Sequence, residues 1–144
     1  MTNKTLKILL IEDDTIEVMK FKRVIQLLEG NHQLLEAKNG ETALTILAEQ
    51  TCKPNIIILD LNMPKMNGIE FLSILKNDKI LKYIPVVILT TSSNDKDIQE
   101  LYKIGIAGYF VKPLKYEDYV LKVRKVLDYW CTSELPVALA NKSI

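Results

Sequence analysis

Three apolar runs in this chain are followed by charged residues that could take part in metal binding or catalysis. Asp60 follows the run at 56–59, Glu12 and Asp13 follow the run at 8–11, and Lys112 follows the run at 109–111. Four large apolar residues in a row are typical of a strand buried on both faces, so the next residue lies at the rim of the core. Carboxylates and an ammonium group at such a rim could hold a metal ion and a phosphoryl group.

Apolar runs of strand length alternate with segments of helical period, which is typical of a parallel sheet with crossover helices. The pattern predicts five helices and five strands, the strands at 7–11, 33–37, 56–59, 86–89 and 108–111. The last helix is expected at about 116–130. Right-handed crossovers place the carboxyl ends of parallel strands at one edge. We therefore expect Glu12, Asp13, Asp60, Lys112 and Thr90, which follows the fourth strand, to converge there.

The residue types at this edge favour a hard metal ion and phosphoryl chemistry. Crowded carboxylates repel one another unless their pKa values rise or a cation neutralises them. An all-oxygen site suits Mg²⁺, and no histidine or cysteine stands beside these residues to favour zinc. Lys112 and the Thr90 hydroxyl can hold phosphoryl oxygens, so Asp60 is predicted to be a nucleophile that becomes an acyl phosphate.

The composition is that of one globular domain with nearly balanced charge. The chain has 144 residues, with 19 lysines and arginines against 18 aspartates and glutamates. This balance argues against the strongly basic surface that drives nucleic-acid binding. Two cysteines outside any CxxC pattern are too few for a disulfide framework, and neither a signal peptide nor a membrane-spanning run is visible. We expect a cytoplasmic protein that contacts neither nucleic acid nor a membrane.

Several motifs, in matching order and spacing, make the chain similar to a known family. They are Glu12-Asp13 after the first strand, Asp60 in the segment ILDLNMPKMNG, Thr90 after the fourth strand, and Lys112-Pro113 in GYFVKPL. The chain resembles the receiver domain of two-component response regulators over about residues 4–130, with 131–144 as a C-terminal tail. This resemblance implies an α/β, doubly wound, flavodoxin-like fold whose five-stranded parallel sheet has the strand order 2-1-3-4-5.

The resemblance also implies roles for the matching acids. Asp60 is the expected phosphoacceptor, which receives a phosphoryl group from a phosphohistidine on a sensor histidine kinase or a histidine phosphotransfer protein. Glu12, Asp13, Asp60 and the backbone carbonyl of Asn62 form the expected Mg²⁺ site, with Glu12 acting largely through water. The protein is expected to catalyse its own phosphotransfer and a slow autodephosphorylation, and not to be an enzyme for outside substrates.

Other matching residues carry the expected switch. Lys112 and Thr90 would hold phosphoryl oxygens, and the Thr90 hydroxyl and the Tyr109 ring resemble the family's switch pair, which changes position on phosphorylation. The bond between Lys112 and Pro113 is expected to be cis, as it is in the family. The output is expected to be phosphorylation-dependent binding of an unknown downstream protein to a face made by 95–104, strand five and the last helix, because no DNA-binding domain follows residue 130.

A narrower likeness concerns the segment VVILTTS, the helix start at Asp97-Ile98, and Tyr129-Trp130 followed by Leu135-Pro136. These features are similar to the small stand-alone regulators that serve bacterial phytochrome kinases, some of which are homodimers. The likeness therefore leaves open a phytochrome-associated function and a homodimer.

Three other functions fit the pattern less well. An FMN carrier of the flavodoxin type needs a hydroxyl-rich, glycine-containing phosphate loop after the first strand, where this chain has three acids. A dehalogenase-type phosphatase needs a second aspartate two residues after its nucleophile, where this chain has Asn62. A receiver that serves only as an unphosphorylated interaction module typically lacks one of the acids or the lysine, and this chain has them all.

The remaining candidates for chemistry have simpler interpretations. Asp14 and Glu17 are expected to be solvated loop charges, and His32 a surface loop residue. Cys52 and Cys131 are expected to be inert.

Overall fold

The structure is a computed structural model that describes residues 5–49, 51, 53–63 and 66–136. Strands and helices alternate along these residues. The strands are β1 Lys7–Ile11, β2 Gln33–Ala37, β3 Ile56–Leu59, β4 Val86–Thr90 and β5 Gly108–Val111. The helices are α1 Thr15–Leu27, α2 Gly40–Glu49, α3 Gly68–Lys76, the short 3-10 helix η1 Leu81–Tyr83, α4 Asp95–Ile104 and α5 Tyr116–Thr132.

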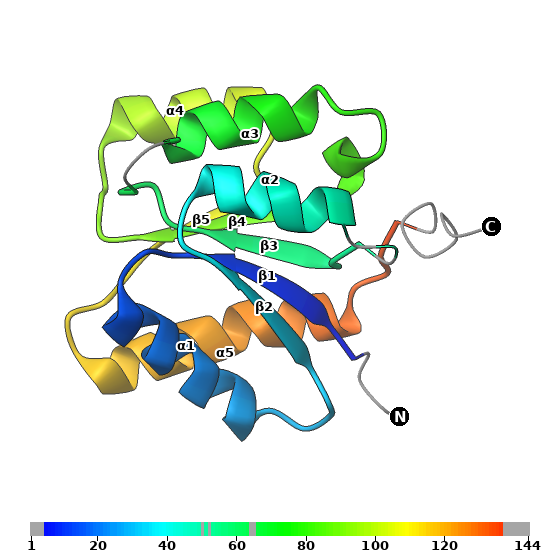
Figure 1. Ribbon diagram of the computed structural model, residues 1–144. Coiled ribbons are helices and arrows are strands. Elements are labelled where there is room, and N and C mark those ends of the chain that lie inside the picture. The colour runs from blue at the N-terminus through cyan, green and yellow to red at the C-terminus, as the bar shows by residue number, and fades with distance from the viewer. Residues whose placement is uncertain (1–4, 50, 52, 64–65, 137–144) are drawn as a thin grey trace.

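The strands form one parallel sheet in the order β2-β1-β3-β4-β5, which confirms the predicted topology. Figure 1 shows α1 and α5 on one face of the sheet and α2, α3 and α4 on the other. Helices on both faces explain why the central strands are continuous apolar runs without polar alternation. All four residues of β3 and all five of β4 are buried.

Two hydrophobic cores lie on the two faces of the sheet. Alternate strand residues point to opposite faces, so Ile57 and Leu59 contribute to the core beneath α2, α3 and α4, while Ile56 and Ile58 contribute to the core beneath α1 and α5. Phe71 of α3 fills the first core and Phe21 of α1 fills the second, and both side chains are fully buried. The packing of both cores against the sheet fixes the strand ends at one edge.

Two predictions need correction at the level of single residues. Thr90 is the last residue of β4 and is fully buried, whereas it was expected after the strand. Helix α5 runs to Thr132 and not to Trp130. His32 lies in the loop between α1 and β2, as expected, and is partly buried there, with its Nδ1 accepting from the N–H of Leu6 at 3.0 Å. Cys131 is buried with a free thiol, and Cys52 lies outside the described residues.

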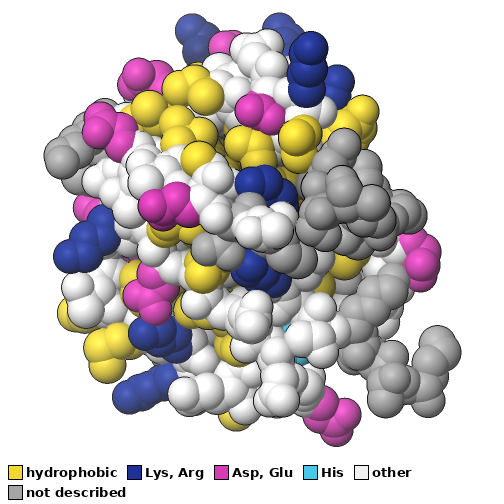
Figure 2. Space-filling view, turned by 45° about the vertical axis from the view of Figure 1, so that its right-hand side comes forward, with side chains coloured by type: hydrophobic (Ala, Val, Ile, Leu, Met, Phe, Trp, Pro, Cys, Tyr) yellow, Lys and Arg dark blue, Asp and Glu magenta, His cyan; other side chains and the backbone are white. Residues whose placement is uncertain are grey.

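The surface mixes charges of both signs with scattered apolar side chains. On the face drawn in Figure 2, Lys and Arg side chains and Asp and Glu side chains are scattered among apolar ones. No helix in the described part of the chain has the length and apolar character needed to cross a membrane.

Candidate functional site

Backbone hydrogen bonds fix three charged residues just beyond the strand ends. In each case the N–H donates to the last carbonyl of the neighbouring strand: Glu12 to Ala37 at 2.9 Å, Asp60 to Ile11 at 3.0 Å and Lys112 to Thr90 at 2.8 Å. Each of these residues therefore continues the strand pairing by one position. The carboxyl ends of β1, β3 and β5 lie at the same edge of the sheet, at the left of Figure 1, as the crossover argument predicts.

Glu12, Asp13 and Asp60 form an acidic cluster in which one carboxylate oxygen of each residue lies within 4.8 Å of the others. Glu12 and Asp60 are buried, whereas Asp13 is exposed. Opposite oxygens around an octahedral Mg²⁺ lie roughly 4.1 Å apart, so small side-chain movements would allow these oxygens to coordinate one ion. The cluster could therefore bind a divalent metal ion, and its exposed side would admit the waters that Mg²⁺ retains.

Both oxygens of Glu12 already have partners. Its Oε1 accepts from the ammonium group of Lys112 at 2.7 Å, and its Oε2 accepts from the N–H of Asp14 at 3.2 Å. Glu12 would therefore act on a metal ion through water, while Asp13 and Asp60 are better placed as direct ligands.

The fourth predicted ligand, Asn62, lies in the loop between β3 and α3, at the same edge of the sheet. It lines a cavity of about 130 Å³, and the other lining residues are Leu61, Asn67, Gly68, Ile69, Ser92 and Asp97. Gly68 allows a close approach here, because a Cβ atom would lie 3.3 Å from the Leu61 Cα. Pro64 of the same predicted motif lies outside the described residues.

Lys112 is the central cation of the site, and its ion pairs are with glutamates. Its Nζ lies 2.7 Å from Glu12 Oε1 and 3.1 Å from Glu17 Oε1. Within the described ranges, no ion pair joins Lys112 to Asp60. Lys112 is thus beside the acidic cluster, as predicted, but it is held on the Glu12 side of it.

Burial and charge shift the pKa values of this pair. Burial raises the pKa of Glu12 to about 7, and the charge of Asp60 adds to this effect while Lys112 opposes it. Burial lowers the pKa of Lys112, but the hydrogen bond to Glu12, the charges of Glu12 and Asp60 and the contact with Glu17 outweigh it, so the net shift is upward. Lys112 therefore remains a cation.

Glu17 belongs to the site, so its interpretation as a solvated loop charge is wrong. It lies in the first turn of α1, where its Oε1 meets Lys112 and its Oε2 lies 3.1 Å from Lys20 Nζ. Burial opposes ionisation of Glu17, but the two lysines lower its pKa on balance. The three-residue spacing from Glu17 to Lys20 in a predicted helix could have indicated the Glu17–Lys20 ion pair, but no sequence signal indicated the contact of Glu17 with Lys112. Asp14 is exposed as expected, and it caps α1 by accepting from the N–H of Ile16.

The predicted switch residues Thr90 and Tyr109 meet at the backbone of Ser92. The Tyr109 hydroxyl donates to the Ser92 carbonyl at 2.7 Å, and the Thr90 hydroxyl lies 3.5 Å from the Ser92 N–H. Burial raises the pKa of Tyr109, and the charges of Asp97 and Asp60 add to this shift. The Tyr109 hydroxyl therefore keeps its proton and holds the loop between β4 and α4.

The bond between Lys112 and Pro113 was expected to be cis, but it is trans, like every other peptide bond among the described residues. The trans form of an X-Pro bond is favoured by roughly 0.5–1 kcal/mol. Lys112 reaches Glu12 with a trans bond, at 2.7 Å.

Comparisons with known proteins agree with this geometry. A family model described as the response regulator receiver domain matches residues 8–124. Response regulator Rcp1 from Synechocystis sp. is 34% identical over 137 residues, which cover 91% of this chain and 93% of Rcp1.

Two solved structures are similar over nearly their whole length. The phosphorylated cyanobacterial phytochrome response regulator RcpA superposes with a TM-score of 0.87 at 30% identity, covering 92% of this chain and 99% of RcpA. The Mn²⁺-bound form of response regulator Rcp1 superposes with a TM-score of 0.85 at 34% identity, covering 91% and 99%. The acidic cluster at the sheet edge, the parallel sheet in the order β2-β1-β3-β4-β5 and these matches lead to one conclusion: the chain belongs to the response regulator receiver domain family.

Proposed function

We propose that this protein is a single-domain response regulator of a phosphorelay, with Asp60 as its phosphoacceptor. The observation that carries the proposal is the joint position of Asp60, Glu12 and Asp13 within 4.8 Å, with Lys112 paired to Glu12 beside them. The phosphodonor would be a phosphohistidine on a sensor histidine kinase or a histidine phosphotransfer protein. The family match and the relatives of similar length support this assignment.

In the proposed reaction, a carboxylate oxygen of Asp60 attacks the phosphorus atom of the donor. The new oxygen–phosphorus bond forms as the bond from phosphorus to the imidazole nitrogen breaks, and the imidazole keeps the electron pair. Asp60 is buried at the rim of the core, so its carboxylate is held in a fixed position for this attack. In hydrolysis, Asp60 becomes the leaving group. A water oxygen attacks phosphorus, the bond from phosphorus to the Asp60 oxygen breaks, and the carboxylate keeps the electron pair while inorganic phosphate departs.

Two side chains would hold the new phosphoryl oxygens. Lys112 has three N–H donors and would redirect one or more of them from Glu12 and Glu17. The Thr90 hydroxyl is buried at the end of β4 and would donate to a second phosphoryl oxygen. Mg²⁺ held by Asp13 and Asp60, with Glu12 through water and the carbonyl of Asn62, would neutralise negative charge on the phosphoryl group.

A direct test is labelling of the purified chain with radioactive acetyl phosphate in the presence and absence of Mg²⁺. The expected result is a Mg²⁺-dependent, acid-stable and base-labile label that disappears in Asp60→Asn. Asp97→Asn is the matched control, since Asp97 lies at the same edge but outside the acidic cluster, and it should still be labelled. Persistent labelling of Asp60→Asn would remove Asp60 as the phosphoacceptor.

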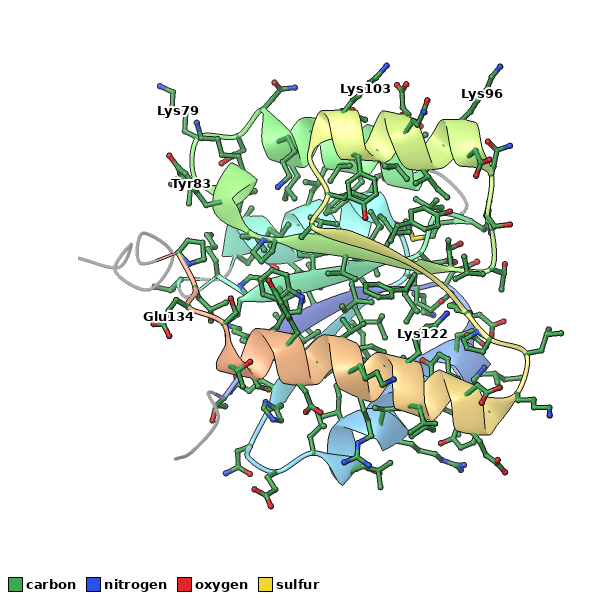
Figure 3. The ribbon with its side chains drawn as sticks, turned by 180° about the vertical axis from the view of Figure 1, so that it is seen from behind. Lys79, Tyr83, Lys96, Lys103, Lys122 and Glu134 are labelled. Carbon is green, nitrogen blue, oxygen red and sulfur yellow. The ribbon has the colours of Figure 1, made fainter. Side chains whose placement is uncertain are left out.

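The proposed output is binding of a downstream protein to the face made by α4, β5 and α5, and not turnover of an outside substrate. Figure 3 shows this face, with Lys96 and Lys103 pointing from α4 into solvent. An apolar cavity of about 510 Å³ opens beside β5 and α5, and its lining residues are Val87, Ala107, Phe110, Lys125, Val126, Tyr129 and Trp130. Tyr109 connects this face to the site through its bond to Ser92.

The proposal includes a cytoplasmic location, in which a sensor kinase could reach Asp60. A phytochrome-type kinase is the proposed class of donor, supported by the similarity to RcpA and Rcp1 over their whole length. A homodimer through α5 remains part of the same proposal, and light scattering with and without acetyl phosphate would test it.

A further inference from the structure

The ion pair between Lys112 and Glu17 has no function in the proposed phosphotransfer. Glu17 is not one of the acids at the strand ends, and it approaches the site from the first turn of α1. Its Oε1 is shielded from solvent and lies 3.1 Å from Lys112 Nζ, yet it accepts no well-aligned hydrogen bond from the residues that the structure describes. A shielded carboxylate oxygen without an aligned donor is costly unless a nearby charge compensates it. The Lys112 ammonium group is that charge.

Lys112 is therefore shared between two carboxylates. Glu12 holds it through an aligned hydrogen bond of 2.7 Å, and Glu17 attracts it from the α1 side. Contact with a phosphoryl group on Asp60 requires the ammonium group to turn toward a third anion. The flexible stem of Lys112 permits this movement, but the attraction of the ammonium group to Glu17 at 3.1 Å opposes it.

Glu17 has a second lysine that can compensate it when Lys112 moves. Lys20 Nζ lies 3.1 Å from Glu17 Oε2, and the same ammonium group lies 4.5 Å from the centre of the Tyr119 ring on α5. This cation–π contact holds Lys20 in place. The network thus runs from Lys112 through Glu17 to Lys20, and the two lysines compete for one carboxylate.

We propose that Glu17 is a positioning residue that holds Lys112 away from the phosphorylation site in the resting protein, and that Lys20 sets the strength of this hold by competing for Glu17. The inference rests on the proposed function of Asp60. It gives the site a built-in restraint: phosphorylation must displace Lys112 from Glu17, after which Glu17 is neutralised by Lys20.

The first test measures the affinity of the full chain for beryllium fluoride, a tetrahedral mimic of the phosphoryl group, by calorimetry at fixed Mg²⁺. Glu17→Gln keeps the shape of the side chain and removes its charge, so it should tighten the affinity about three- to ten-fold, as expected for loss of a half-buried ion pair. Lys20→Met keeps an apolar side chain against Tyr119 but removes the lysine that competes for Glu17. Glu17 then attracts Lys112 more strongly, so the affinity for beryllium fluoride should weaken. The initial rate of labelling by acetyl phosphate should change in the same directions.

The two substitutions would also change the affinity in opposite directions if each charge acted on the bound anion directly, through the local electric field. The double variant distinguishes this direct effect from competition of the two lysines for Glu17. If Lys20 acts through Glu17, then Lys20→Met has no effect in the Glu17→Gln background. If the two charges act independently on the ligand, their effects multiply. Multiplying effects would overturn the proposal.

Matched controls address folding and net charge. Glu36→Gln removes the same charge from the exposed Lys22–Glu36 pair of 2.7 Å, and it should leave the affinity unchanged. If Glu17→Gln does not fold, Glu17→Asp withdraws the carboxylate from Lys112 and should shift the affinity in the same direction by a smaller factor. Wild-type protein that neither binds beryllium fluoride nor accepts a label would refute the proposed function. Wild-type binding with unchanged affinity in the Glu17 and Lys20 variants would refute this inference alone.

Discussion

Lys112 and Glu12 form an ion pair of 2.7 Å at the edge of the sheet, with 7% and 5% of their side chains exposed. Burial disfavours the charge on both residues, and their mutual attraction offsets that cost only while both are present. The pair joins the end of β5 to the end of β1 beside the predicted phosphoacceptor. Its behaviour can therefore be tested by removing the lysine, by changing the pH and by adding a metal ion.

Replacing Lys112 with Met should destabilise the fold more at pH 8 than at pH 5.5. Removal of one partner from a buried ion pair costs roughly 3–5 kcal/mol because the other charge is left unpaired. Burial raises the pKa of Glu12 to about 7 while Lys112 lowers it, so the carboxyl group is already largely neutral at pH 5.5. At pH 8 the variant must either protonate Glu12 or leave its charge unpaired. Urea unfolding with EDTA present at both pH values measures the difference.

The control for this prediction is Lys22→Met, which removes the exposed pair of Lys22 with Glu36. It should change the free energy of unfolding by less than about 0.5 kcal/mol at either pH. An equal loss of stability at both pH values in Lys112→Met would contradict the role assigned to Glu12.

Mg²⁺ should raise the melting temperature, and more at pH 8 than at pH 5.5. The pKa of Glu12 rises from 4.5 to about 7 on folding. The native state therefore binds more protons than the unfolded state in this window, and Glu12 makes the protein less stable as the pH rises through it. A cation offsets the repulsion that appears when Glu12 ionises beside Asp60. At ten times its dissociation constant, Mg²⁺ adds about 1.4 kcal/mol.

For a chain of this size that stabilisation corresponds to a shift of roughly 3–6 °C, which differential scanning calorimetry resolves. Asp13→Asn should abolish most of the shift because it removes the exposed ligand of the cluster. A shift of the same size in Asp13→Asn would argue against this metal site.

Tyr109→Phe should loosen the loop between β4 and α4 without preventing phosphorylation. The variant loses the 2.7 Å hydrogen bond from the Tyr109 hydroxyl to the Ser92 carbonyl, which costs about 0.5–1.5 kcal/mol of stability. Hydrogen exchange at 91–94 should accelerate, while labelling by acetyl phosphate remains. Tyr102→Phe is the control, because Tyr102 is 51% exposed on α4, and its exchange pattern should match that of the wild type.

Lys103→Glu should alter partner binding while leaving phosphorylation unchanged, and it should lower stability by no more than about 1 kcal/mol because Lys103 lies in the last turn of α4. Lys103 is exposed on α4 and points into solvent, so it can contact a partner but does not support the core. The measurement compares proteins captured from a cell extract by the phosphorylated wild type, by Lys103→Glu and by Asp60→Asn. If Lys103→Glu captures the same phosphorylation-dependent proteins as the wild type, the output face does not include this part of α4.

Much of the fold followed from local patterns. The run at 56–59 predicted a strand buried on both faces, and β3 has these bounds with all four residues buried. Gly105 predicted the end of a helix, and it adopts a φ of +128° at the C-cap of α4, a conformation that glycine tolerates. Such signals depend on neighbours in the sequence. The strand order came from the family resemblance, since periodicity does not specify which strands pair.

The candidate site shows the same division between local pattern and tertiary packing. The sequence by itself determined which side chains stand at the strand ends, because each follows an apolar run directly. Only the tertiary structure decided that Lys112 pairs with Glu12 and Glu17, because these contacts join β5 to β1 and α1 across 100 positions of sequence for Glu12. The sequence identified Asp60 as the centre of the candidate site, and tertiary packing determined that Glu12 and Glu17 pair with Lys112.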